Sequence, residues 1–335
     1  MTSKELVINT INFTNKNRVP RQLWDLQWAS NKFPEELKQI NTNFPDDLIY
    51  SPEFYKEKPI LFGDRHKKGI FKDAWGCEFF NLQDGIIGEV KTPLLKDWSD
   101  ITNIRIPKQL LTTDINKVNK FCLENNDKFI LSPLLARPFE QLQFMRKPEV
   151  LYMDLYDYPN EIKSILNILH EFYLELINIW VKTDIDGIFI MDDWGSQNNL
   201  LISPIMWKEI FKPMYKDYIK LAHENDKYVF MHSDGYILDI YDDLIEIGID
   251  AINSQIFCMG IDKLSKYKGK ITFWGEIDRQ HILSSGTKVD VKNAVKNIYN
   301  NLYDNGGVIA QCEFGPGTKP ENVYSVFEEW GKLII

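Results

Sequence analysis

Residues 186–235 read DGIFIMDDWGSQNNLLISPIMWKEIFKPMYKDYIKLAHENDKYVFMHSDG. The stretch begins with a short apolar run that ends on two aspartates and continues as an amphipathic segment. It closes with a second apolar run that ends on a histidine, a serine and an aspartate. In between, Ser203 and Pro204 are residue types preferred at the N-cap and the first position of a helix. The succession of strand, helix and strand predicts a βαβ unit with parallel strands.

The same alternation extends to both sides of this unit. Apolar, β-rich runs that end on polar residues occupy 128–138, 186–197, 227–235, 250–255, 270–280 and 306–317, with helical patterns at 159–183, 203–225 and 287–307. Because the strands are apolar throughout, they predict a parallel sheet that helices cover on both faces. Residues 18–26 are a candidate for a further strand near the start.

An open sheet and a closed (β/α)8 barrel both fit this alternation. No Gly-x-Gly-x-x-Gly turn follows any strand, which removes support for a dinucleotide-binding sheet. Polar residues end nearly every strand: Arg137, Asp192, Asp193, His232, Asp234, Gln255, Glu276, Asp278, Cys312 and Glu313. In a barrel these ends converge on one pocket, whereas in an open sheet only the strands beside the switch point share a site. We therefore expect an α/β protein with a (β/α)8 TIM barrel.

Composition limits the domain organisation and the class of protein. No linker or repeat divides the 335 residues, so we expect one domain over 1–335. Residues 126–335 carry the main βα repeats, and 1–125 are expected to supply the early barrel and an N-terminal extension over one rim. The net charge of −9 disfavours nucleic-acid binding. Without a secretory signal or an apolar stretch of about 18 residues, we expect a cytoplasmic protein outside the membrane.

Three residues at strand ends are candidate metal ligands. His232 and Asp234 are two positions apart on one strand, so their side chains share a face. Cys312 ends a later strand and meets them if the strands close into a barrel. Imidazole, carboxylate and thiolate are all zinc ligands, and three protein ligands are typical of a catalytic zinc site. The alternative is a hydrogen-bonded His–Asp pair beside an inert buried cysteine.

Other polar and aromatic residues are candidates for catalysis or substrate binding. Carboxylates that share a cavity, such as Asp193 and Glu276, raise one another's pKa, which suits acid–base chemistry or metal binding. The alternative for each carboxylate is helix capping, which fits Asp278 best. Arg137 either clamps an anionic or oxygen-rich substrate or pairs with a neighbouring carboxylate. The remaining candidates for substrate binding are Trp75, Asp192, Trp194, Gln197 and Gln255, of which the tryptophans are equally compatible with rim packing.

Four segments carry a resemblance to a known family. DDWGSQNNLLISPIMWKEIFKPMYKDYIKLAHEN, VFMHSDG, ITFWGEIDRQ and CEFGPGTKPENV together resemble the uroporphyrinogen decarboxylase superfamily, and more closely its branch of corrinoid- and zinc-dependent methyltransferases. The resemblance covers about residues 125–335, and NRVP, DAWGCEF and PLLKDWSDI extend it towards the N-terminus. It implies a (β/α)8 barrel.

The resemblance also implies a zinc site with one departure from the branch. That branch holds zinc by His-x-Cys and a later Cys, which correspond here to His232 and Cys312. Asp234 stands where the branch has its first cysteine. Asp234 therefore binds as a carboxylate, or Glu276 replaces it, or the metal is lost. An oxygen ligand in place of sulfur would make the metal a harder Lewis acid.

The activity that the resemblance implies is methyl transfer. The donor would be a small O- or N-methylated compound, and the acceptor the cobalamin of a separate corrinoid protein. Zn²⁺ would stabilise charge on the substrate heteroatom, with Asp193 or Glu313 as general acid and Glu276 as a further catalytic candidate. Two alternatives remain: uroporphyrinogen decarboxylation, which the negative charge and the seven arginines make a poor match for a substrate with eight carboxylates, and a catalytically silent ligand-binding barrel. The oligomeric state stays open.

Overall fold

The predicted barrel is confirmed. The computed structural model describes residues 1–333. Eight parallel strands form one sheet in the order β1-β11-β10-β9-β8-β7-β6-β2. They are β1 (Arg21–Asp25), β2 (Leu48–Tyr50), β6 (Phe129–Ala136), β7 (Gly187–Met191), β8 (Tyr228–Ser233), β9 (Ala251–Ser254), β10 (Thr272–Trp274) and β11 (Val308–Phe314). The backbone N–H of Asp47, just before β2, donates to the carbonyl of Arg21 in β1 at 2.9 Å, so the sheet nearly closes on itself.

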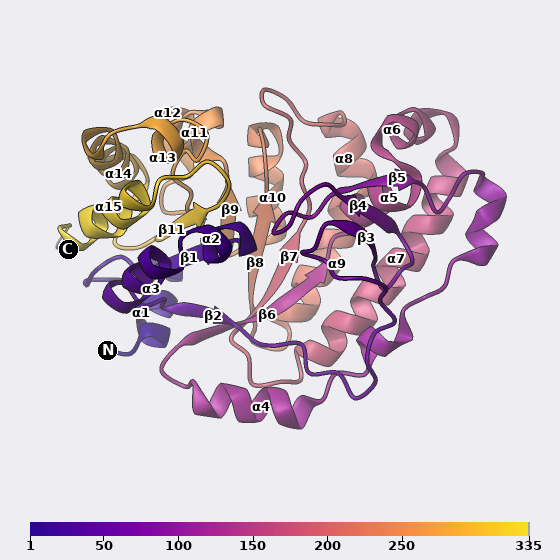
Figure 1. The fold of residues 1–335 in the computed structure, drawn as a ribbon, viewed down its shortest axis with the longest axis horizontal. Helices are drawn as coiled ribbons and strands as arrows, with labels where there is room; N and C mark the ends of the chain where they lie inside the picture. Colours follow the sequence, from indigo (N-terminus) through magenta and orange to yellow (C-terminus); the bar gives the residue numbers. More distant parts are fainter. Residues whose placement is uncertain (334–335) are drawn as a thin grey trace.

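Helices surround this sheet (Figure 1). The longer ones are α1 (Ser3–Ile11), α2 (Gln27–Lys32), α3 (Pro34–Asn43), α4 (Ile115–Glu124), α5 (Pro138–Arg146), α6 (Pro148–Asp157), α7 (Pro159–Trp180), α8 (Pro204–Ile210), α9 (Lys212–His223), α10 (Tyr241–Ile247), α14 (Lys288–Leu302) and α15 (Pro320–Gly331). Single turns form α11 (Ile256–Met259), α12 (Ile261–Leu264), α13 (Ile282–Ser285) and the 3-10 segments η1 (Trp98–Asn103), η2 (Lys108–Leu111), η3 (Leu238–Ile240) and η4 (Ser265–Tyr267). Since β1 pairs with β11, the first helices lie beside the last ones in Figure 1. None of the helices within residues 1–333 is long and apolar enough to cross a membrane.

Local sequence explains where the helices begin and end. Ser203 caps α8 as expected, because its hydroxyl accepts the backbone N–H of Met206 at 3.2 Å. The single helix predicted over 203–225 is two helices, which is a correction. Pro213 lies in the first turn of α9, where it has no N–H to continue the hydrogen bonds of α8. Thr287 caps α14, and its side chain and that of Asp290 form a capping box.

Side chains of the barrel strands alternate between two cores. The interior core contains Leu48, Phe129, Leu131, Phe189, Phe230, Ala251, Trp274 and Ile309. Val7 and Ile11 of α1 belong to the same core and close the amino-terminal end of the barrel. The residues next to these in sequence, such as Ile188, Val229, Ile252 and Val308, belong to the outer core beneath the helices. A residue's position along its strand therefore decides whether its side chain faces the barrel interior.

The predicted N-terminal extension covers one rim. A separate antiparallel sheet consists of β3 (Gly69–Lys72), β4 (Glu78–Asn81) and β5 (Glu89–Thr92). Its Phe71 and Phe79 are buried and face a cavity at the carboxyl ends of β6 and β7. Figure 1 shows this sheet beside α5 and α7. Residues 1–125 also provide β1, which the sequence predicted, and β2, which it did not.

Candidate metal and substrate site

Three side chains meet where β7 and β8 end. The Nε2 atom of His232 lies 3.5 Å from Oδ1 of Asp193 and 3.6 Å from Oδ1 of Asp234. The backbone N–H of Asp234 donates to Oδ1 of Asp193 at 2.9 Å, which joins the two strand ends. Among residues 1–333, these three form the one group of three or more potential ligands whose donor atoms all lie within 4.8 Å of one another. We call it the Asp193–His232–Asp234 group.

The protonation of His232 follows from its neighbours. The side-chain amide of Asn253 donates to the carbonyl of Trp274, so its Oδ1 points the other way and accepts from Nδ1 of His232 at 2.6 Å. Nδ1 therefore carries a proton, and Nε2 faces the two aspartates. Trp24 packs against the ring with centroids 5.2 Å apart. Hydrogen bonding of the second ring nitrogen in this way is typical of metal-binding histidines.

The spacing of the three donor atoms fits a metal ion. In a tetrahedral site with bonds of about 2.1 Å, neighbouring ligand atoms are about 3.4 Å apart. The distances of 3.5 and 3.6 Å from His232 to the aspartates are close to that value. One nitrogen and two oxygen donors suit Zn²⁺ or a harder divalent ion and leave a fourth position for substrate. The residues present therefore fit a catalytic metal.

Arg279 organises the carboxylates beside this group. It donates to Oδ2 of Asp234, and its Nη1 lies 2.8 Å from Oε2 of Glu313. Its Nε lies 3.9 Å from Oε1 of Glu276. Although burial opposes its charge, the three carboxylates raise the pKa of Arg279. Burial raises the pKa of Glu276 well above its ordinary value, against the effect of Arg279, so this carboxyl is the one most easily kept protonated.

Cys312 lies outside the group, in contrast to the ligand set expected from the sequence. In the register of β1 and β11, Leu23 is opposite Cys312 and Trp24 is opposite Glu313. Trp24 faces His232 in the barrel interior, whereas Leu23 and Cys312 belong to the outer core. The Cys312 thiol is fully buried under the helices, and this burial, followed by two nearby carboxylates, raises its pKa. The third member of the group is therefore Asp193, whereas the sequence led us to expect Cys312 beside His232 and Asp234.

Two cavities lie near the group, although none of its three residues lines either of them. A cavity of about 750 Å³ lies between the β3–β5 sheet and the ends of β6 and β7, and both Arg137 and Trp75 line it as candidates for substrate binding. A smaller cavity of about 130 Å³ is lined by Gln197, Gln255, Glu276 and Arg279. Gln255 also donates to Oδ1 of Asp234 at 3.2 Å. The small cavity therefore lies beside Asp234, which one of its lining side chains contacts.

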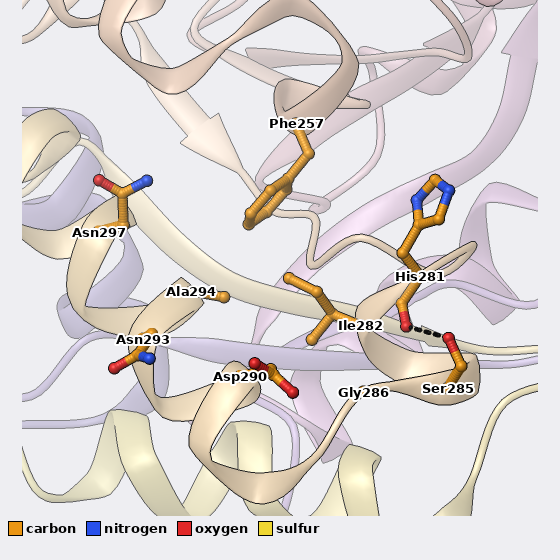
Figure 2. Close-up of a pocket in the computed structure, with 9 residues that line it drawn as sticks. All are labelled: Phe257, His281, Ile282, Ser285, Gly286, Asp290, Asn293, Ala294 and Asn297. Atoms are coloured by element: carbon orange, nitrogen blue, oxygen red, sulfur yellow. Dashed lines mark hydrogen bonds between the residues drawn. The ribbon is translucent and has the colours of Figure 1, made fainter.

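A third, more open hollow lies farther out, between α11, α13 and α14. It measures about 540 Å³, and Figure 2 shows the side chains that line it, among them Phe257, His281 and Asp290. Phe257 and His281 also line the small cavity, so the hollow adjoins that cavity. None of the candidate site residues predicted from the sequence lines it.

Comparisons with known proteins bear on the family. Residues 70–332 match the family model described as uroporphyrinogen decarboxylase (URO-D). The chain belongs to the URO-D family. No curated protein matches the sequence significantly.

Several solved structures are similar to this URO-D family member. A methyltransferase from Methanosarcina mazei is 15% identical with a TM-score of 0.69, and the match covers 99% of each chain. An intracellular xylanase from Thermoanaerobacterium saccharolyticum matches at 12% identity and a TM-score of 0.43, over 92% of this chain and 95% of that one. A GH18 chitinase from Flavobacterium johnsoniae matches at 9% identity and 0.41, over 93% and 94%. Identities this low concern the fold alone.

Two of the residues predicted to bind substrate have structural partners instead in this family member. Asp192 is fully buried and accepts the backbone N–H groups of Phe139 and Glu140 at 3.1 and 2.7 Å, together with the hydroxyl of Tyr215. It thus caps the start of α5, and burial raises its pKa to about 7. Trp194 is also fully buried and stacks on Phe139 with ring centroids 4.0 Å apart. The role of Trp194 is therefore packing, which was the alternative to substrate binding.

Sequence reasoning missed several residues around the site. Asn253 ends the apolar run of β9 and is two positions before Gln255, a spacing that places both on the interior face. Arg279 follows Glu276 by three residues in a segment that already contained two candidates. Glu140 lies in the first turn of α5, a helix that the sequence analysis did not predict. One of its carboxyl oxygens is buried without a hydrogen-bond partner, and burial raises its pKa to about 8.

Proposed function

We propose that this URO-D family member is a metal-dependent methyltransferase, which moves a methyl group from a small O- or N-methylated substrate to the corrinoid of a separate protein. The observation that carries the proposal is the Asp193–His232–Asp234 group, with the Nε2 lone pair of His232 aimed at two carboxylates. The cavity of about 750 Å³ near the group is large enough for a small methylated substrate. The barrel's likeness to a Methanosarcina mazei methyltransferase agrees with this choice.

Zinc is the metal we propose, held by His232, Asp193 and Asp234. When bound, it would supply a Lewis acid that stabilises charge on the heteroatom released from the methyl group. Arg279 holds one oxygen of Asp234 and leaves the other directed at His232. Asn253 accepts from Nδ1 and so leaves Nε2 as the nitrogen that would bind the metal.

Proton donation to the leaving group falls to the remaining carboxyls. Asp193 belongs to the proposed ligand set, and Glu313 is engaged in a 2.8 Å ion pair with Arg279. Glu276 is buried, lines the small cavity and is 3.9 Å from the same guanidinium. We therefore propose Glu276 as the general acid, in preference to Asp193 or Glu313.

Decarboxylation of uroporphyrinogen is a weaker hypothesis than methyl transfer. Asp193, Asp234 and Glu313 converge at the ends of β7, β8 and β11, and one arginine faces the last two. A substrate with eight carboxylates would be repelled from this mouth.

The test combines metal content with a methyl-transfer assay. Elemental analysis of the purified protein should find about one zinc per chain. His232→Ala should lose the metal, and His281→Ala, which changes an exposed histidine of the outer hollow, should keep it. Free cob(I)alamin serves as acceptor for a panel of methyl ethers and methylamines, and methylcobalamin is detected by its absorption spectrum. Metal in both variants would refute the site. If His232→Ala loses the metal but the wild-type protein transfers no methyl group from any panel member, the hypothesis of a catalytically silent ligand-binding barrel would remain.

A further inference from the structure

The 750 Å³ cavity has walls suited to an apolar molecule. Its lining includes the aromatic residues Phe71, Trp75, Phe79, Phe144 and Phe172. Two of these belong to the β3–β5 sheet, and Phe172 belongs to α7, so the cavity is enclosed between the extension and the barrel. Pockets of this size with mainly apolar walls and a few polar groups are typical sites for small molecules.

The polar groups in these walls are incompletely paired. Arg137 stacks over Phe144 at 5.0 Å, and its nearest carboxylate oxygen within ion-pair range, on Glu140, is 4.0 Å away. Arg65 lines the same cavity at its rim and forms no ion pair within 4.0 Å among the described residues. The side chain of Tyr173 is 4% exposed, and its hydroxyl has no hydrogen-bond partner. Three donor side chains thus face one cavity without a close acceptor.

Two buried carboxyls share the cavity, and their charge bears on which ligand fits. Asp73 and Glu140 each have one oxygen that is buried without a partner. Burial raises the pKa of both, that of Glu140 to about 8. Glu140 lies 4.0 Å from the guanidinium of Arg137, too far to occupy it in a close ion pair. An acceptor that matches the free guanidinium edge and the free phenol is a carboxylate, which takes paired N–H donors.

We propose that this cavity binds a carboxylate attached to an apolar, ring-sized body, with Arg137 and Tyr173 holding the carboxylate and Arg65 attracting it at the rim. The proposal deepens the proposed function, since the bound molecule would be the methyl donor, and it names the donor's chemical class. The aromatic walls would hold the body of the molecule while the methylated end faces the Asp193–His232–Asp234 group.

The test uses a pair of probes without a methyl group, so that binding is measured apart from methyl transfer. Benzoate and benzamide have nearly the same shape, and only benzoate is charged. Ligand-observed NMR titration should show benzoate binding about tenfold or more tightly than benzamide. Arg137→Met keeps the aliphatic stem and should remove this preference without weakening benzamide. Tyr173→Phe removes one oxygen and should weaken benzoate about tenfold. Arg105→Met, at an exposed arginine outside the cavity, should change neither affinity.

Several outcomes would overturn the proposal: equal binding of the two probes, no binding of either, or unchanged benzoate affinity in both variants. The thermal unfolding midpoint checks that Arg137→Met folds. If Arg137→Met does not fold, the nearly isosteric variant Tyr173→Phe still tests whether the cavity binds a carboxylate. Failure here would leave the metal site and methyl transfer untouched. Conversely, a carboxylate-selective cavity in a protein without methyl transfer would refute only the proposed function.

Discussion

Asn253 accepts the Nδ1 hydrogen of His232 at 2.6 Å while its own amide donates to the carbonyl of Trp274. This pair of contacts fixes which end of the Asn253 amide faces the imidazole, and so fixes the tautomer of His232. The two residues lie side by side in the register of β8 and β9. The proposed ligand atom is thus oriented by a residue on β9, which is one strand away from Asp234 and two strands away from Asp193.

Removal of this acceptor should weaken metal binding. Asn253→Leu frees the imidazole to rotate or change tautomer, and we expect zinc affinity to fall about 10–100-fold. Asn253→Asp keeps an oxygen acceptor and should retain more of the affinity. Competition with a chromophoric chelator measures both, and Asn293→Ala, an exposed residue of the outer hollow, is the control. Equal affinities for Asn253→Leu and wild type would show that the ring does not bind the metal through Nε2.

The barrel could be predicted from the sequence because its strongest signals are long. Apolar runs followed by helical patterns recur six times, and six of the eight strands lie in them. β2 is three residues long, LIY, which is too short to show a period, so it was missed. The break between α8 and α9 depends on Pro213, whose effect on the helix was overlooked.

The site was predicted less completely, because neighbouring residues on a strand face opposite ways. Asp192 and Asp193 are adjacent, yet one caps α5 under the outer core and the other faces His232. Cys312 and Glu313 differ in the same manner. A resemblance assigns a residue to a position in the chain, whereas the register with neighbouring strands decides its face. That register could not be derived from one sequence.

Asp193 faces His232 in the barrel interior, whereas Cys312 lies in the outer core, so the two residues should differ in their effect on metal binding. We expect Asp193→Ala to lose zinc and Cys312→Ala to keep it, because the thiol lies in the outer core. Elemental analysis of both variants, after equal dialysis, compares them directly. The Cys312→Ala change should cost about 1–2 kcal/mol of stability through the small cavity that it leaves. Loss of metal from Cys312→Ala with its fold intact would restore the ligand set implied by the family resemblance.

Asp192 should matter for stability and not for the metal. Asp192→Ala leaves two backbone N–H groups and the Tyr215 hydroxyl without their acceptor in a buried place. We expect the free energy of unfolding to fall by about 2–4 kcal/mol, as for other losses of a buried network. Urea denaturation measures the change, and zinc content should stay at the wild-type level in the folded variant. An unchanged midpoint would contradict the capping role.

Glu140 should make the stability of the protein depend on pH. Burial raises its pKa from the ordinary value of 4.5 to about 8 in the folded state. Between these values the folded protein binds the proton more tightly than the unfolded chain, so the stabilisation is complete below pH 4.5 and declines as the pH rises towards 8. Glu140→Gln removes the titration and should therefore gain stability relative to wild type from pH 5 to pH 8, by about 1 kcal/mol or more. Urea unfolding at several pH values measures this difference, and Glu149→Gln, on the exposed side of α6, is the matched control. A constant difference between Glu140→Gln and wild type across this range would mean that the carboxyl does not titrate there.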